Sequence, residues 1–169
     1  MADLAAHLLV NHIAAVRWVD RVRLGYFVTG ALMPDLASRV PRVVLNQAVE
    51  LGWIESTTET FRLMLGLDFP HTPIGVLLVA VLVSLVLPER LARPPGRVAT
   101  GWMLCLGGWL HLGVDLMQSH LAPAYRYFYP FSVRAFELGW ISTEQSLVAV
   151  PLLGLIAWWL SRGRSDARS

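Results

Sequence analysis

Histidine and aspartate side chains recur at separated points of this apolar chain and offer the most direct chemistry. In the stretch 107–120, read as GGWLHLGVDLMQSH, His111 and Asp115 are four residues apart, so a helix would stack them on one face. An imidazole and a carboxylate are costly to bury among apolar side chains unless they pair with each other or bind a cation. For this pair alone, both alternatives stay open.

Three more candidate ligands lie elsewhere in the chain. His7 is near the start of the expected first helix, Asp35 follows Pro34, and His71 precedes an apolar helix. Taken singly, they suit simpler roles as an interfacial histidine, a helix cap and a loop residue. Imidazoles and carboxylates that converge from several elements suit a borderline divalent metal. Together they predict a metal site whose ligands would be His7, Asp35, His71, His111 and Asp115.

The sequence offers weaker candidates for the other roles of an active site. Glu50 or His120 would serve as a general base, although little supports either residue. Arg126 and Arg134 belong to a tyrosine-rich segment and would bind an anionic head group, or would simply anchor this segment at the membrane interface. His12, like His120, would lie behind the ligands or at the interface.

Composition favours a membrane protein. The 169 residues are most simply one domain over 1–169, with 55% hydrophobic residues and 15% charged residues. A formal net charge of +2, with no basic stripe, argues against a nucleic-acid partner. The single cysteine, Cys105, excludes an intrachain disulfide and a thiolate metal cluster.

The elements that must position these residues are helices. A first helix is expected over about 3–19, and apolar runs at about 73–88, 98–119 and 146–161 predict membrane helices. Pro34 disfavours helix at the residue before it, so we expect a turn or a helix start at Asp35. The fold class is therefore all-α, a multi-helix integral membrane bundle with a polar metal-site cluster near one membrane face. A soluble helical bundle is the alternative.

Arginine sets the expected topology, because all fourteen basic residues are arginine. Clusters at 17–23, 90–97 and 162–168 can share the cytoplasmic side if the helices alternate. The candidate ligands then all fall near the opposite face.

A five-residue segment occurs twice. Glu50–Ile54 reads ELGWI, and so does Glu137–Ile141. Each copy is followed by a helix-capping pattern, STTE after the first and STEQ after the second. We expect two equivalent surface segments with tryptophan at the lipid interface.

The ordered motifs resemble those of the bacterial membrane-bound metal-dependent hydrolase family, from end to end. This family has an early histidine, a G-x-L-x-P-D segment, a Thr-His or similar motif before an apolar helix, an H-x-x-x-D helix and a P-F-S segment. The matching positions are His7, Gly30–Asp35, His71–Thr72, His111–Asp115 and Tyr129–Ser132. A more distant likeness is to zinc-dependent phospholipase C, an all-helical fold with histidine and aspartate ligands.

The chain departs from the family pattern just before His71. Family members commonly carry a His-Arg pair about five residues before the Thr-His motif, where this chain has Gly66-Leu67. A serine expected after this motif is Pro73. A chain that had lost such a group would bind metal without catalysing a reaction.

The residues and the resemblance together imply a metal-dependent hydrolase of the bacterial cytoplasmic (inner) membrane. It would act at the membrane surface on a phosphoester or another lipid-linked substrate, with its site on the non-cytoplasmic face. The cofactor would be a divalent metal, with zinc favoured over manganese or iron, and the partner would be membrane lipid. The alternative is a non-catalytic membrane scaffold or complex subunit with a protein partner, in which the polar cluster is structural.

Overall fold

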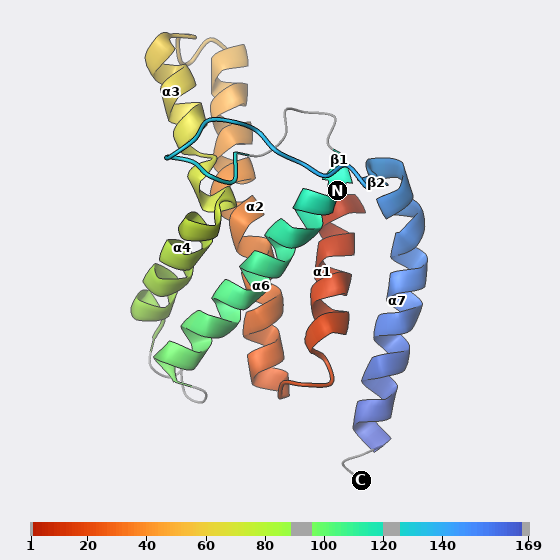
Figure 1. Cartoon of the computed structure of the whole chain (residues 1–169). Helices are drawn as coiled ribbons and strands as arrows, with labels where there is room; N and C mark the ends of the chain where they lie inside the picture. The colour runs from red at the N-terminus through yellow and green to blue at the C-terminus, as the bar shows by residue number, and fades with distance from the viewer. Residues whose placement is uncertain (1, 89–95, 120–125, 167–169) are drawn as a thin grey trace.

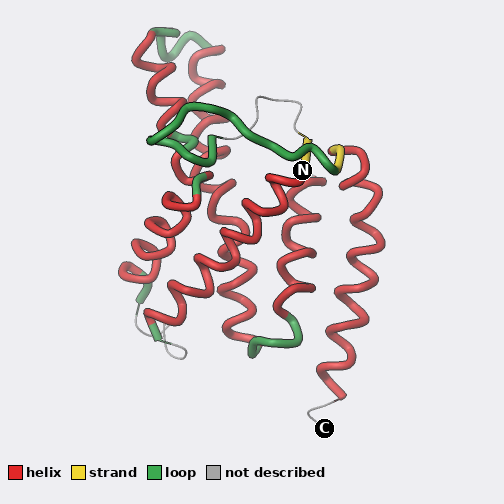
Figure 2. The backbone as a smooth tube through the Cα atoms, viewed as in Figure 1, coloured by secondary structure: helices red, strands yellow, loops and turns green. Residues whose placement is uncertain are grey.

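The protein is mostly helical in the computed structural model, which describes residues 2–88, 96–119 and 126–166 (Figures 1 and 2). This part contains six α-helices, one 3₁₀ helix and two short strands. The helices are α1 (Ala2–Ala15), α2 (Arg21–Glu50), α3 (Thr58–Gly66), η1 (Phe69–His71), α4 (Pro73–Val86), α6 (Arg97–Met117) and α7 (Thr143–Asp166). The strands β1 (Gln118–Ser119) and β2 (Ile141–Ser142) pair in parallel.

Helix α6 lies at the centre of the helical body. It packs against α2, α4 and α1, while α7 lies at the edge and packs against α1 (Figure 1). The second half of α2 continues past the other helices and forms an antiparallel hairpin with α3 (Figure 1). The loop from residue 126 to β2 crosses one end of the body and leads into α7 (Figure 2). The start of α1, the short η1 and the last turns of α6, which carry candidate ligands, therefore meet at one level (Figure 1).

Two glycines allow α2 and α6 to pack backbone against backbone. A Cβ atom on Gly30 would come within 2.1 Å of the Leu104 carbonyl oxygen, and one on Gly107 within 1.9 Å of the Phe27 carbonyl oxygen. Any larger side chain would force the two helices apart. Gly113, on the same helix as Gly107, instead faces open space.

The turn expected at Asp35 is not formed. Helix α2 runs without interruption through both Pro34 and Pro41. Proline removes one helical hydrogen bond, and its ring crowds the carbonyl four residues earlier. Pro34 is itself buried, together with Gly30, Ala31, Met33 and Asp35. We attribute the continuous helix to this burial, because packing against α6 can offset the local cost of one proline.

The helix expected at about 73–88 begins at Thr72 and Pro73. The Thr72 hydroxyl accepts a hydrogen bond from the Gly75 amide at 2.9 Å, and Pro73 is the first residue of α4. The same hydroxyl donates to the Phe69 carbonyl at 2.8 Å. Thr72 thus fixes the join between η1 and α4, and with it the position of His71.

The three expected membrane helices are present as helices, but they differ in character. Within the described residues, α7 is long and apolar enough to cross a membrane over Glu144–Gly163, and 11% of that window is buried. Helix α4 qualifies only together with Thr58–His71, at a bend of 78°. The run at 98–119 forms α6, which is not a candidate span. One face of α6, which includes Leu104, Cys105 and Leu112, is buried inside the protein, whereas Val98 and Trp102 are exposed.

The two ELGWI segments share a backbone feature. Gly52 and Gly139 both have positive φ, at 73° and 64°, which glycine adopts without strain. After the second copy, the Ser142 hydroxyl accepts from the Gln145 amide and the Gln145 side chain accepts from the Ser142 amide, which is a complete capping box. After the first copy, Thr57 caps α3 through the Thr60 amide. Both helix starts are therefore confirmed, although the first helix is capped by Thr57, one residue after Ser56 of the expected pattern.

Arginine and tryptophan gather at the end of the body opposite the candidate ligands. The Arg162 guanidinium lies 4.0 Å from the centre of the Trp158 ring, and that of Arg17 lies 5.5 Å from the Trp159 ring. Exposed aromatic rings beside arginine are typical of a membrane–water interface. Arg90, Arg93 and Arg168 of the expected basic clusters lie outside the described residues.

Candidate metal centre

Four segments of the chain deliver imidazole and carboxylate groups to one buried cluster. Helix α1 contributes His7, α2 contributes Asp35, η1 contributes His71, and α6 contributes His111 and Asp115. All five residues are buried, and His111 and Asp115 are fully so. The structure therefore brings together every residue that the sequence suggested as a metal ligand, and their role as ligands remains a prediction.

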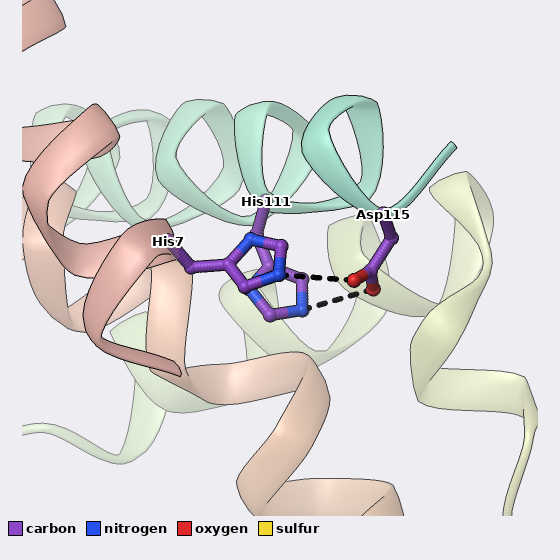
Figure 3. A group of neighbouring side chains, drawn as sticks. All are labelled: His7, His111 and Asp115. Atoms are coloured by element: carbon purple, nitrogen blue, oxygen red, sulfur yellow. Dashed lines mark ion pairs between the residues drawn. The ribbon is translucent and has the colours of Figure 1, made fainter. Parts of the chain in front are cut away.

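Asp115 lies at the centre of this cluster. Its Oδ1 is 3.0 Å from Nε2 of His7, and its Oδ2 is 3.2 Å from Nε2 of His111. Figure 3 shows these two contacts and the stacked rings of His7 and His111, whose centres are 4.1 Å apart. Oδ2 also lies 3.5 Å from Nε2 of His71. Each of the three imidazoles thus presents Nε2 to the same carboxylate.

Asp35 approaches the cluster from α2. Its Oδ1 is 3.3 Å from Nε2 of His71 and 3.9 Å from Nε2 of His111. Two groups of three residues therefore have donor atoms that all lie within 4.8 Å of one another, and both groups contain His111. These groups are His7, His111 and Asp115, and Asp35, His71 and His111.

The donor set fits a divalent metal ion. Donor atoms that share one ion at about 2.0–2.2 Å lie about 3.0–3.5 Å from one another, which is the range of most distances in the cluster. Within the described part of the chain, neither ring nitrogen of His111 makes a hydrogen bond of normal geometry, although the residue is fully buried. A buried polar atom of this kind is costly unless a cation or water satisfies it.

A hydroxyl group orients one of the imidazoles. The Ser38 hydroxyl lies 2.6 Å from Nδ1 of His71, and both residues are buried. If Nδ1 carries the proton and donates to Ser38, the Nε2 lone pair points at the cluster, and this is how outer partners commonly orient histidine ligands. Sequence reasoning missed Ser38. The available signal was its position three residues after Asp35, on the same face of a helix.

Arg39 forms an ion pair with the cluster. Its Nε is 2.9 Å from Oδ1 of Asp35, the same oxygen that faces His71. Burial acts to raise the pKa of the Asp35 carboxyl, but the hydrogen bond with His71 and the charges of His111 and Arg39 outweigh it and lower the pKa. Asp35 is therefore held as an anion, which a metal ligand requires. Arg39 was also missed by the sequence reasoning.

A second carboxylate lies beside the cluster and joins two more arginines. Asp68 forms an ion pair with Arg42 of α2 through Oδ1, and a second ion pair with Arg126 through Oδ2, at 2.7 Å. The Asp68 carbonyl also accepts from the His71 amide at 2.9 Å. The Tyr127 hydroxyl donates to the Leu112 carbonyl at 3.3 Å. Together with the Arg126–Asp68 contact, this bond holds the chain that begins at residue 126 against the helical body.

Three other predicted residues, Glu50, Arg134 and His12, lie apart from the cluster. Glu50 is exposed at the end of α2, fifteen residues after Asp35 and thus about 22 Å away along the helix. Arg134 is exposed, and among the described residues its hydrogen bond runs from its backbone amide to Ser132. His12 lies 2.9 Å from the Ser161 hydroxyl and joins α1 to α7. His120 lies outside the described residues.

Comparison with known families agrees with the motif order. Residues 4–168 match the family described as "YdjM inner membrane protein", which is the membrane-bound metal-dependent hydrolase family. The chain belongs to this family. No curated protein and no solved structure matches the chain. The match covers nearly the whole chain, so the predicted resemblance is confirmed, and the family is one of inner membrane proteins.

Family membership and geometry bear on the same residues of this chain. The matched range contains all three histidines and both aspartates of the cluster. It also contains α7, the helix that is long and apolar enough to span a membrane. A possible metal site in an inner membrane protein is therefore supported by two independent findings.

Proposed function

We propose that this protein is a metal-dependent hydrolase that acts at the membrane surface on a phosphoester or another lipid-linked group. The observation that carries the proposal is the convergence of three imidazoles on the carboxylate of Asp115, within 3.5 Å and away from solvent. The residues that would hold the ion are His7, Asp35, His71, His111 and Asp115. When bound, a divalent ion would polarise the ester and make a water molecule more acidic.

The chain's own residues would perform the remaining tasks. Ser38 would keep His71 in the tautomer that offers Nε2. Asp35 would remain ionised beside Arg39. Burial of the imidazoles would exclude bulk water from the ligand side, where charge interactions are stronger than in water. Zinc is favoured by the mixture of nitrogen and oxygen donors, and manganese or iron would also accept this set.

The position of the cluster supports an active site on the non-cytoplasmic face. The ligands lie towards the end of the body that carries the start of α1, and Arg17 and Arg162 lie towards the opposite end (Figure 1). Arginine accumulates on the cytoplasmic side of membrane proteins. Substrate carried by the outer leaflet would then reach the cluster without crossing the membrane.

Metal content of the purified protein tests the proposal. We expect bound metal in the wild type and about tenfold or greater loss of affinity in His111→Ala, because this residue belongs to both groups of donors. His12→Ala is the matched control, since His12 contacts Ser161 outside the cluster. Wild-type protein that binds no zinc, manganese or iron would overturn the proposal. Metal-loaded protein would then be assayed with phosphoester and lipid substrates.

A non-catalytic scaffold is the second candidate, and one observation favours it. The imidazole–carboxylate distances of 3.0 to 3.5 Å are short enough for the five side chains to satisfy one another as a structural polar cluster. In that case His111→Ala would lower the thermal stability of a protein that never bound metal. Stability and metal content, measured on the same preparations, separate the two functions.

A further inference from the structure

Arginine side chains line the side of the cluster that faces solvent. On α2, Asp35, Arg39 and Arg42 follow the spacing i, i+4 and i+7, so they share one helix face. Arg39 contacts the oxygen of Asp35 that also faces His71. Its guanidinium is therefore separated from a candidate ligand imidazole by a single carboxylate oxygen.

Asp68 brings two more guanidinium groups to the same place. One comes from Arg42, and the other comes from Arg126, more than fifty residues later in the chain. Because the Asp68 carbonyl bonds to the His71 amide, this carboxylate is fixed one turn before a candidate ligand. The ion pairs with Asp68 and Asp35 thus hold three arginines beside the metal centre.

Solvent exposure distinguishes the three arginines from the candidate ligands. The side chains of Arg39, Arg42 and Arg126 are 40%, 39% and 26% exposed. Those of the five candidate ligands are at most 11% exposed. Arg42 also donates to the Met64 carbonyl at 3.0 Å. A guanidinium has five N–H donors, so it can bind a second group beside its carboxylate partner. An anion that approaches from solvent would meet these donors before it reached the ligands.

The charges of this region indicate when an anion would bind. The carboxylates of Asp35, Asp68 and Asp115 balance the three guanidinium groups one for one. If the imidazoles are neutral, none of these groups balances the positive charge of a bound divalent ion. Anion binding should therefore depend on the metal, although the arginines supply the hydrogen bonds.

We propose that Arg39, Arg42 and Arg126 form an anion-binding rim that takes the phosphate group of the substrate beside the metal centre. Guanidinium forks match the oxygen spacing of phosphate and bind it with charge-assisted hydrogen bonds. The inference rests on the proposed function and narrows its substrate class to phosphoesters. It also replaces the expected pair of Arg126 with Arg134 by a set in which each member contacts a carboxylate at the site.

Inorganic phosphate is the probe. Its affinity for the full chain in detergent would be measured by calorimetry, with and without stoichiometric zinc, and metal content would be determined for each sample. We expect binding to the metal-loaded wild type and about tenfold or greater weakening in Arg39→Gln and in Arg126→Gln. Arg39→Lys should recover only part of the affinity, because it keeps the charge and loses the fork. Arg62→Gln is the matched control, since Arg62 forms an exposed ion pair with Glu59 on α3.

The outcomes separate this inference from the proposed function. If the wild type binds zinc but not phosphate, or if Arg39→Gln and Arg126→Gln bind phosphate as tightly as Arg62→Gln, the rim is only structural and the inference is overturned. If the wild type binds no metal, the proposed function is overturned, and the inference that rests on it is overturned as well. Should Arg39→Gln lose zinc, Arg126→Gln decides the question, because its contact is Asp68 and not a candidate ligand.

Two further arms identify the source of the phosphate group. Glycerol 3-phosphate represents a soluble phosphoester, and mixed micelles containing phosphatidic acid represent a lipid head group. Competition with inorganic phosphate by both compounds supports the shared chemistry, and a lower inhibition constant for the micelles assigns the site to lipid. Competition by neither compound would overturn the assignment to phosphoesters.

Discussion

Asp115 and Asp35 together contact the three imidazoles of the cluster. Asp115 faces all three histidines, whereas Asp35 faces two of them and is itself held by Arg39. Both carboxylates are buried, and such groups need partners that can offset the loss of water. The residues behind the ligands, Ser38 and Arg39, therefore matter as much as the ligands for the geometry of the cluster.

Ser38→Ala tests this dependence on a residue that is not a ligand. We expect metal affinity to fall about tenfold to a hundredfold, because His71 loses the hydroxyl that lies 2.6 Å from its Nδ1. Ser38→Thr should restore most of the affinity. The measurement is zinc competition with a chromophoric chelator. Ser84→Ala is the control, because its hydroxyl bonds only within α4 among the described contacts, to the Val81 carbonyl. Equal zinc affinity in Ser38→Ala and Ser84→Ala would contradict the role of Ser38.

At the scale of elements, the crossing of α2 and α6 decides where the ligands meet. Gly30 and Gly107 remove side chains from the contact, so the two backbones touch. Asp35 is little more than one turn after Gly30, and His111 is four residues after Gly107. A change in the distance between these helices would therefore move a carboxylate relative to an imidazole.

Gly107→Ala should destabilise the protein by about 1–3 kcal/mol, because its Cβ would lie 1.9 Å from the Phe27 carbonyl oxygen. It should also weaken zinc binding, since Asp35 would move away from His111. Gly113→Ala, on the same helix, meets nothing within 4 Å, and should leave stability unchanged or raise it by about 1 kcal/mol or less. Thermal unfolding in detergent measures both variants. Similar melting temperatures for the two would show that close packing at Gly107 is not needed.

The whole molecule combines one clear candidate span with a buried polar cluster. Helix α7 exposes apolar side chains along Glu144–Gly163, while α6 buries one face that carries His111 and Asp115 inside the protein. Arginine–tryptophan contacts lie at one end, and the ligands lie towards the other (Figure 1). This separation is the basis for the proposed orientation in the membrane.

Cysteine labelling in intact cells tests this orientation. In a Cys105→Ser background, Glu50→Cys should react with an impermeant maleimide from outside the inner membrane, because Glu50 is exposed beyond the ligand end of the body. Arg21→Cys lies at the arginine end and should react only after the cells are disrupted. The reverse pattern would place the cluster on the cytoplasmic side.

The sequence by itself determined the local features of this protein. His111 and Asp115 share a helix face, Thr72 and Pro73 start α4, and the capping patterns start α3 and α7, because each depends on residues within one or two turns. The order of the polar motifs was sufficient to recognise the family. The candidate ligands were predicted because histidine and aspartate are conspicuous in an apolar chain.

Only the tertiary structure decided which residues support these ligands. The roles of Ser38, Arg39 and Arg42 depend on α2 remaining helical through Pro34, against the local preference of proline. The core role of α6 depends on packing against α2 and α4, since an apolar run suits a protein core as well as a bilayer. The local preference for helix or turn depends on neighbouring residues. Burial and ion pairing depend on contacts between distant segments, whose free energies can outweigh the local preference.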